Sequence, residues 1–178
     1  MNTLPLIDPA TAPAKTAAML ASIQRSLGVT PNMTKAMANS PALLKGYRDL
    51  SAALAGGRLG AAVREQVALA VAQGNACDYC LSAHSYLAEH VAHLDTDTIA
   101  AARKADSPDW HTAAVIRLAA KVNDTRGAIG SGSLDAARTA GVTDEQIAET
   151  IGLVALNVLT NYFNKAAGVE VDFLHVSA

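Results

Sequence analysis

Apolar residues recur with a helical period along nearly the whole chain, and residues typical of helix ends divide this pattern into segments. Prolines and serines mark the starts of several segments, and glycines mark their ends. In the first half of the chain the pattern predicts three helices, over about residues 13–28, 41–56 and 60–73. Ser40 is the predicted N-cap of the second helix.

The second half of the chain has the same pattern and predicts five further helices. Their predicted starts are near Ala76 with Asn75 as the N-cap, at Asp95 or Thr96, after Ser107–Pro108, at Leu134 and at Asp144. The last helix, which extends to about Ala167, starts with a predicted capping box formed by Thr143 and Gln146. The tail of residues 169–178 is compatible with a short extended segment, but the sequence provides no convincing partner strand.

These segments predict an all-α fold, a compact bundle of about eight helices. No linker is long enough to separate two domains, because the Gly/Ser-rich stretch of residues 127–133 is more simply a surface loop. We therefore expect a single domain over residues 1–178, in which residues 1–13 form an extended N-terminal arm.

Composition adds an expectation about assembly. The chain has 178 residues, of which 51% are hydrophobic and only 4% aromatic. Small side chains let helices approach closely, and association adds buried apolar surface worth roughly 25 cal/mol per Å². We therefore expect a homo-oligomer. The net charge of −2 and the lack of a basic run predict no nucleic-acid partner.

The chain also lacks the sequence features of membrane insertion or export. Its first residues, MNTLPLIDPATAP, lack the charged and apolar regions of a signal peptide. The longest apolar candidate, Ile151–Leu159, is too short to cross a bilayer and contains Asn157. We therefore expect a soluble, cytoplasmic protein without a membrane partner.

Candidate chemistry lies in one short motif. The two cysteines of the chain, Cys77 and Cys80, form a C-x-x-C, which in a reducing compartment is typical of redox chemistry or metal binding. His84 follows at the spacing that places all three side chains on one face of a helix. The helix N-terminus favours a thiolate at Cys77, whereas the imidazole favours proton exchange at Cys80. The residues alone therefore leave open which thiol reacts first.

A carboxylate on the preceding predicted helix is a candidate partner of this motif. Glu65 stands among apolar neighbours, and a partly buried carboxylate there is a usable proton acceptor. Tyr79 and Asn161 are candidate pocket-lining residues. Asn161 recurs with Asn157 and Asn164 along one face of the last predicted helix, so hydrogen bonding between helices is the favoured alternative for this set.

The run EQVALAVAQGNACDYCLSAH, from Glu65 to His84, resembles the core motif of the alkyl hydroperoxidase D-like and carboxymuconolactone decarboxylase superfamily. The resemblance rests on a glutamate, eleven residues, C-x-x-C, three residues and a histidine. The later stretch NYFNKAAGVEVDF, from Asn161 to Phe173, resembles the end of the peroxidase-related members. The resemblance covers most of the chain from about Pro41 onward.

The resemblance implies an all-helical fold assembled as trimers or hexamers. It also implies a dithiol that reduces hydroperoxides and is recycled by a lipoyl or other dithiol reductant, with no bound cofactor. By position, Cys80 would attack the peroxide, Cys77 would resolve the product, and His84 and Glu65 would form the proton relay. One departure stands out: Tyr79 occupies the place of a second histidine in peroxidase members, and a phenol is not a base at neutral pH.

Other functions remain open from the sequence. The same thiol pair suits a non-catalytic redox-sensing or interaction protein, and the superfamily also includes lyase pockets of the decarboxylase type. Cys77, Cys80 and His84 supply three ligands of a zinc site, for which Glu65, His90 or His93 is a possible fourth ligand. Two cysteines in an alanine-rich helix are otherwise small core residues. We favour the thiol peroxidase and expect no metal.

Overall fold

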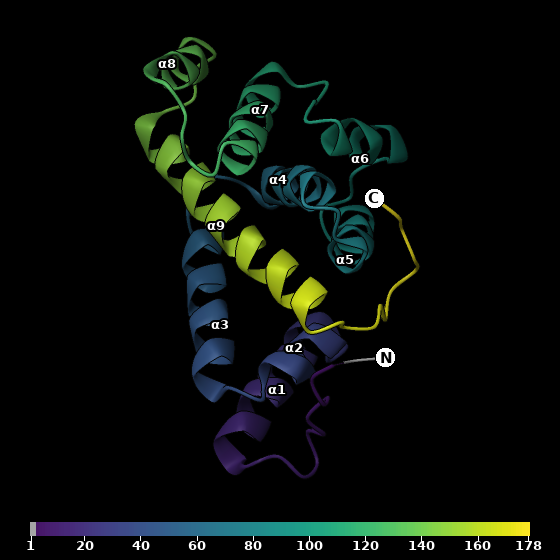
Figure 1. The fold of residues 1–178 in the computed structure, drawn as a ribbon. Helices are drawn as coiled ribbons and strands as arrows, with labels where there is room; N and C mark the ends of the chain where they lie inside the picture. Colours follow the sequence, from purple (N-terminus) through teal and green to yellow (C-terminus); the bar gives the residue numbers. More distant parts are fainter. Residues whose placement is uncertain (1–2) are drawn as a thin grey trace.

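The computed structural model describes residues 3–178, and within this range the chain forms helices and no strand (Figure 1). The prediction of an all-α fold is thus confirmed. The described part contains nine helices, one more than expected. They are α1 (Ala14–Leu27), α2 (Asn32–Met37), α3 (Pro41–Ala55), α4 (Ala61–Gly74), α5 (Asp78–His90), α6 (Thr96–Arg103), α7 (Trp110–Asp124), α8 (Ser131–Thr139) and α9 (Asp144–Ala166).

Helix α4 occupies the centre of this arrangement and packs against α5, α6, α7 and α9 (Figure 1). Every residue from Gln66 to Ala72 is buried, so the helix has no solvent-facing stripe along these two turns. Its three buried alanines, Ala68, Ala70 and Ala72, let neighbouring helices approach closely. A helix that is apolar all round is expected at the core of a helical fold rather than on its surface.

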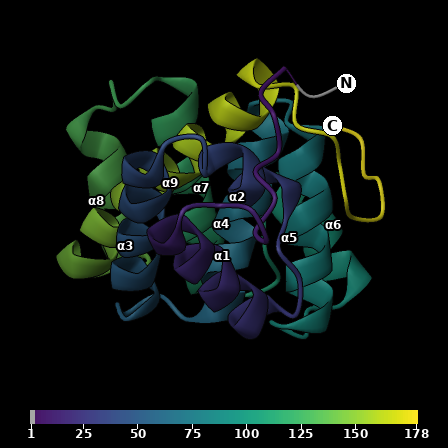
Figure 2. The ribbon, with the colours of Figure 1, turned by 90° about the horizontal axis from the view of Figure 1, so that it is seen from below.

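Helix α9 is the longest element and crosses the molecule, with α3 along one side and α4 and α7 along the other (Figure 1). Seen from below, α1 lies at the near face, beside α2 and α3 (Figure 2). Leu20 and Ile23 of α1 pack with Met37 and Leu44 in a separate small core cluster. The first third of the chain therefore covers one end of the α4–α5–α9 core.

Most predicted helix ends are confirmed by the cap contacts. The Ser40 side chain accepts a hydrogen bond from the Leu43 backbone N–H, and Asp95 caps α6 in the same way. Thr143 and Gln146 form the complete capping box at the start of α9. These ends are encoded within four residues of sequence, so local pattern is enough to find them.

Two predicted caps are wrong. Cys77, not Asn75, is the N-cap of α5, because Asn75 and Ala76 are used to end α4: Ala76 adopts φ 48°, and the Cys77 N–H donates to Ala72 O. Asp109, not Ser107, caps α7 by accepting a 2.7 Å hydrogen bond from the Thr112 N–H.

Two further elements depart from the predicted pattern. Helix α2 was not predicted, because its six residues are too few for a periodic pattern. Helix α8 begins at Ser131, inside the stretch predicted as a loop.

Both ends of the described chain lie outside the helices. Residues 3–13 contain no helix or strand, and residues 1–2 of the predicted arm lie outside the described range. The C-terminal tail passes along α5 and α6 without pairing as a strand (Figure 2). Its Val176 N–H donates to Ser82 Oγ, its Ala178 N–H donates to Asp78 Oδ1, and Ser177 O accepts from Arg103. The tail is therefore fixed by backbone contacts to side chains.

We expect Thr143→Ala to lower the free energy of unfolding by about 1 kcal/mol, because α9 loses the side-chain half of its capping box. Denaturant unfolding of the two proteins measures the change. Thr139→Ala is the matched control, since this exposed hydroxyl bonds only to Asp135 O one turn earlier in its own helix. Equal effects of the two substitutions would contradict a capping role.

Candidate functional site

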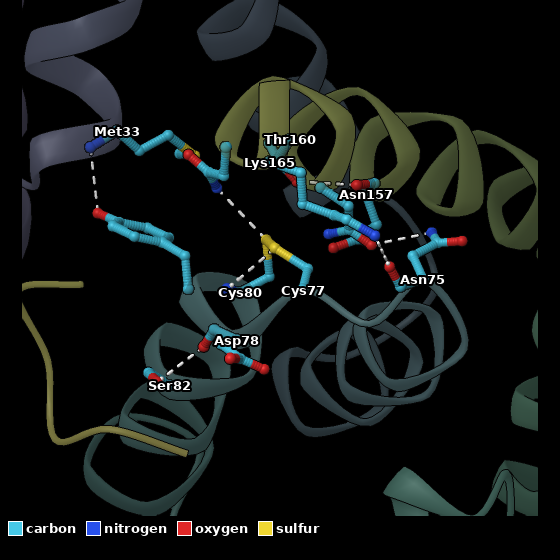
Figure 3. Close-up of a disulfide and its surroundings, with 12 residues drawn as sticks. Met33, Asn75, Cys77, Asp78, Cys80, Ser82, Asn157, Thr160 and Lys165 are labelled. Carbon is cyan, nitrogen blue, oxygen red and sulfur yellow. Dashed lines mark hydrogen bonds between the residues drawn. A yellow bond between two sulfur atoms is a disulfide. The ribbon is translucent and has the colours of Figure 1, made fainter. Parts of the chain in front are cut away.

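A disulfide joins Cys77 and Cys80 at the start of α5, with their Cα atoms 5.3 Å apart (Figure 3). Cys77 is the N-cap residue, and its Sγ accepts a hydrogen bond from the Cys80 backbone N–H at 3.3 Å. Both the N–H group and the helix N-terminus stabilise negative charge on this sulfur after reduction. The sequence predicted that the helix N-terminus favours a thiolate at Cys77. The structure has this arrangement, with Cys77 as the N-cap residue itself.

The second sulfur has a different donor. The side-chain amide of Asn164, on α9, donates to Cys80 Sγ at 3.3 Å and to Met33 Sδ at 3.3 Å. Cys80 and Asn164 are both buried, so the amide is a fixed and water-excluded donor. Hydrogen bonding of this kind favours the charged form of the acceptor. Each cysteine thus has its own N–H group that stabilises a thiolate.

His84 and Glu65 meet across the α4–α5 contact. His84 Nδ1 lies 2.8 Å from Glu65 Oε2, and both side chains are about four-fifths buried, with exposed fractions of 23% and 21%. A carboxylate bound to Nδ1 orients the imidazole and leaves Nε2 for proton exchange. Within residues 3–178 no hydrogen bond joins His84 to either sulfur.

A small apolar cavity connects the imidazole with Cys80. It has a volume of about 80 Å³, and its wall includes Cys80, His84, Ala83, Leu87 and Phe173. A second cavity of about 170 Å³ lies on the other side of the imidazole and is lined by polar groups, including Glu65, Arg64 and Asn157. Tyr47, His84 and Thr160 border both cavities. His84 therefore stands between an apolar chamber at the sulfur and a polar chamber at its carboxylate partner.

Tyr79 lines the apolar cavity and ties three elements together. Its hydroxyl accepts from the Met33 N–H at 3.1 Å (Figure 3). It donates to Asp172 Oδ1 at 2.8 Å. Burial raises the pKa of this phenol above its usual value, and the nearby Asp172 carboxylate adds to that shift. Tyr79 consequently remains protonated and fixes α2 and the C-terminal tail against α5.

The predicted pocket residue Asn161 does not line either cavity. It is fully buried, and its Oδ1 accepts from Asn75 Nδ2 at 2.9 Å. Asn75 also exchanges two 3.1 Å hydrogen bonds with Asn123, which belongs to α7. This side-chain network joins α7 and α9 to the α4–α5 turn, as the helix-bonding alternative anticipated. Asn164, three residues later, is the asparagine that lines the apolar cavity.

The comparisons with known proteins agree with this geometry. Residues 41–124, from the start of α3 to the end of α7, match the sequence model of the Carboxymuconolactone decarboxylase family. This segment, which contains Glu65, both cysteines and His84, is therefore similar in sequence to that family. No protein of curated function shows significant sequence similarity.

Solved structures share the fold over nearly the whole chain. The alkylhydroperoxidase AhpD core protein of Ralstonia eutropha JMP134, described as an uncharacterized peroxidase-related protein, has TM-score 0.85 and 22% identity, covering 96% of this chain and 92% of that one. A peroxidase-related protein of Silicibacter sp. TM1040 has TM-score 0.81 and 23% identity, covering 97% and 90%. The debrominase Bmp8, solved with 2,3,4-tribromopyrrole, has TM-score 0.76 and 16% identity, covering 89% and 86%.

Two further findings concern metal binding and membrane spans. Among residues 3–178, no group of three or more histidine, cysteine, aspartate or glutamate side chains is placed to hold a metal ion. No helix of the same range is long and apolar enough to cross a membrane.

The sequence did not single out Asn164 as a hydrogen-bond donor to Cys80, because this contact joins residues 84 positions apart.

The site predicts a specific dependence of stability on alkaline pH. Burial raises the pKa of Tyr47 to about 12, and the Glu65 charge contributes, whereas an unfolded tyrosine titrates near 10. The unfolded state therefore loses its proton first, and the stability present below pH 10 declines as the pH rises toward 12. We expect Tyr47→Phe to flatten this decline in urea unfolding, while Tyr162→Phe, at an exposed position of α9, leaves it unchanged. An identical decline in Tyr47→Phe would contradict the assignment.

Proposed function

We propose that this chain is a thiol-dependent hydroperoxidase of the peroxidase-related branch, with Cys80 as the attacking residue. The observation that carries the proposal is the shared cavity, in whose wall Cys80 and the Glu65-bound His84 both lie. A hydroperoxide bound there has a sulfur nucleophile and an acid–base group within one small chamber. The Asn164 amide supports a thiolate at this sulfur.

The reaction begins with the reduced dithiol. The Cys80 thiolate attacks the terminal peroxide oxygen, the O–O bond breaks, and the departing alkoxide takes a proton from His84 to leave as an alcohol. Cys80 is now a sulfenic acid. The Cys77 thiolate attacks the Cys80 sulfur, the S–O bond breaks, and the hydroxyl leaves as water with a proton from the relay. The peroxide has gained two electrons, and the dithiol has become the disulfide seen in the structure.

The cavity also supports a substrate class. Its wall is largely aliphatic and aromatic, formed by side chains such as Leu27, Met33, Leu87 and Phe173. Apolar walls favour an uncharged organic group and disfavour a charged one. With a volume of about 80 Å³, the chamber suits a hydroperoxide with a small alkyl group.

The proposal also includes a reductant, a cellular compartment and an oligomeric state. An external dithiol or lipoyl reductant would recycle the disulfide by exchange, as the superfamily resemblance implies. Work in the cytoplasm suits a dithiol that must be returned to its reduced form. Assembly as a trimer or hexamer is supported by large exposed apolar side chains, among them Trp110 at 69% exposure and Tyr162 at 57%.

Single-cysteine variants test the assignment of the two thiols. We expect Cys77→Ser to stop at a sulfenic acid on Cys80, which dimedone traps after one equivalent of ethyl hydroperoxide, because the resolving thiol is absent. Cys80→Ser should leave the peroxide unreduced and form no adduct. Mass spectrometry of the intact protein distinguishes the outcomes.

The reverse pattern, with an adduct on Cys77 only, would exchange the two roles. Unreacted thiols in both variants and in the wild type would exclude the peroxidase and favour a lyase pocket, in which cysteine substitution leaves turnover intact. A wild type that forms its disulfide once but has no turnover with any dithiol would favour a redox sensor.

The relay predicts that Glu65→Gln lowers the rate of Cys80 oxidation by roughly 10²-fold, because His84 loses the carboxylate bound to its Nδ1. Stopped-flow measurement of thiol loss across neutral pH gives the rate. Glu89→Gln is the matched control, since Glu89 is an exposed glutamate of α5 that lies 3.9 Å from His90. An equal loss of rate in both variants would refute the relay.

A further inference from the structure

The two sulfurs of the disulfide border different cavities. Cys80 lines the apolar cavity beside His84, whereas Cys77 lines a larger cleft of about 280 Å³. The larger cleft lies between the start of α5, the end of α9 and the C-terminal tail, and its wall includes Asp78, Lys165, Val171 and His175. Neither cavity is lined by both cysteines, although Tyr79 and Asn164 border both. The disulfide and these two side chains therefore form a partition.

We infer that the cleft beside Cys77 is the binding site of the dithiol reductant, and that the reductant attacks Cys77 from this side while the hydroperoxide reaches Cys80 from the other. This inference rests on the proposed function for the source of the disulfide. It goes further by assigning the reductant its own site, separate from the substrate cavity.

Charge separates the two entrances. The species that attacks a disulfide is a thiolate, and placing an anion in an apolar cavity is costly. The cleft at Cys77 is instead bordered by the N-terminus of α5, which favours anions, and by the exposed residue Lys165, whose ammonium group donates to Asn75 O at 2.7 Å. Its carboxylate, Asp78, already accepts from the Ala178 N–H and lies 3.8 Å from His175. The charged thiolate therefore suits this cleft, and the neutral peroxide suits the other cavity.

The leaving group also fits this direction of attack. A thiolate that approaches Cys77 Sγ opposite the S–S bond forms a new S–S bond with Cys77 and breaks the bond to Cys80. The electron pair passes to Cys80 Sγ, which already accepts the Asn164 N–H at 3.3 Å. The freed Cys80 thiolate is thus the form that begins the next attack on peroxide.

The second half of the exchange indicates the chemical class of the reductant. The mixed disulfide on Cys77 must be broken by another thiol, and a second thiol on the same molecule is already inside the cleft. Its attack forms the cyclic disulfide of the reductant and releases the Cys77 thiolate, so two electrons reach the protein and two thiols are oxidised. A small molecule with two thiols that can close a cyclic disulfide is therefore preferred over a monothiol.

Filling each cavity separately tests the inference. Val171→Trp fills the cleft at Cys77, and Leu27→Trp fills the cavity at Cys80, since Leu27 is 48% exposed at its rim. Oxidised protein is prepared with diamide, and its reduction by dihydrolipoate is followed by stopped flow. Reduced protein is mixed with ethyl hydroperoxide in a parallel experiment. Leu174→Trp is the control, because this tail residue is 87% exposed and lines neither cavity.

We expect Val171→Trp to slow reduction by about tenfold or more through blocked approach while oxidation stays near the wild-type rate. Leu27→Trp should show the opposite pattern, and Leu174→Trp should change neither rate. His175→Trp, at an exposed position of the same cleft, replaces Val171→Trp should that protein fail to fold. Slowing of both half-reactions by Leu27→Trp, with none by either cleft variant, would overturn the inference.

The site of attack gives an independent readout. Oxidised wild type treated briefly with 2-mercaptoethanol and then alkylated should carry the thiol adduct on Cys77 and the alkyl group on Cys80, as fragment mass spectrometry can show. The reverse labelling would overturn the inference. Because diamide makes the disulfide without peroxide, a protein that peroxide never oxidises would end the proposed function, whereas the selective effect of Val171→Trp on reduction would still stand.

Discussion

The position of the site depends on the burial of α4 on all sides. Four helices pack around residues 66–72, so this helix cannot shift without disturbing the whole core. Glu65 comes immediately before the buried stretch, and the turn immediately after it presents Cys77. One rigid helix thus sets both ends of the site, with the carboxylate at one end and the thiols at the other. Rigid elements of this kind hold catalytic groups more precisely than loops do.

Side-chain amides make the second set of constraints. Asn75 binds Asn123 and Asn161, which fixes the α4–α5 turn against α7 and α9, while Asn164 donates to Cys80. Buried amides generally find partners. Asn161 bonds through its Oδ1 and Asn164 through its Nδ2, in both cases to residues outside α9, whereas Asn161 Nδ2 and Asn164 Oδ1 have no hydrogen-bond partner among the described residues. The asparagines of α9 therefore position the disulfide from one side, and α4 positions it from the other.

Sequence patterns were sufficient to predict those interactions that span only a few residues. Cys80 and His84 lie one turn apart on α5 and line one cavity, the caps of α3 and α9 follow local motifs, and the all-α fold follows from the pattern. Cys77 is the exception, since it is the cap before α5 and borders another cavity. Sequence patterns were insufficient to predict contacts between residues that are distant along the chain. Asn75 resembled an N-cap but serves a contact with Asn161, 86 positions away. The sequence placed Glu65 on the right helix, although its contact with His84 required the packing of α4 on α5.

Tyr79 shows how the departure from the peroxidase pattern fits this architecture. A histidine at this position would be a second base, but the phenol has both its hydrogen-bonding roles filled by Met33 and Asp172 and a raised pKa. It therefore contributes a wall to both cavities, and the proposed proton transfer is assigned to His84 alone. A wall is useful here because an open path between the two cavities would let a thiolate reductant and a hydroperoxide meet at one sulfur. In the proposed reaction, the tyrosine thus takes the place of a proton-transfer group and serves as a barrier between the sites of the two half-reactions.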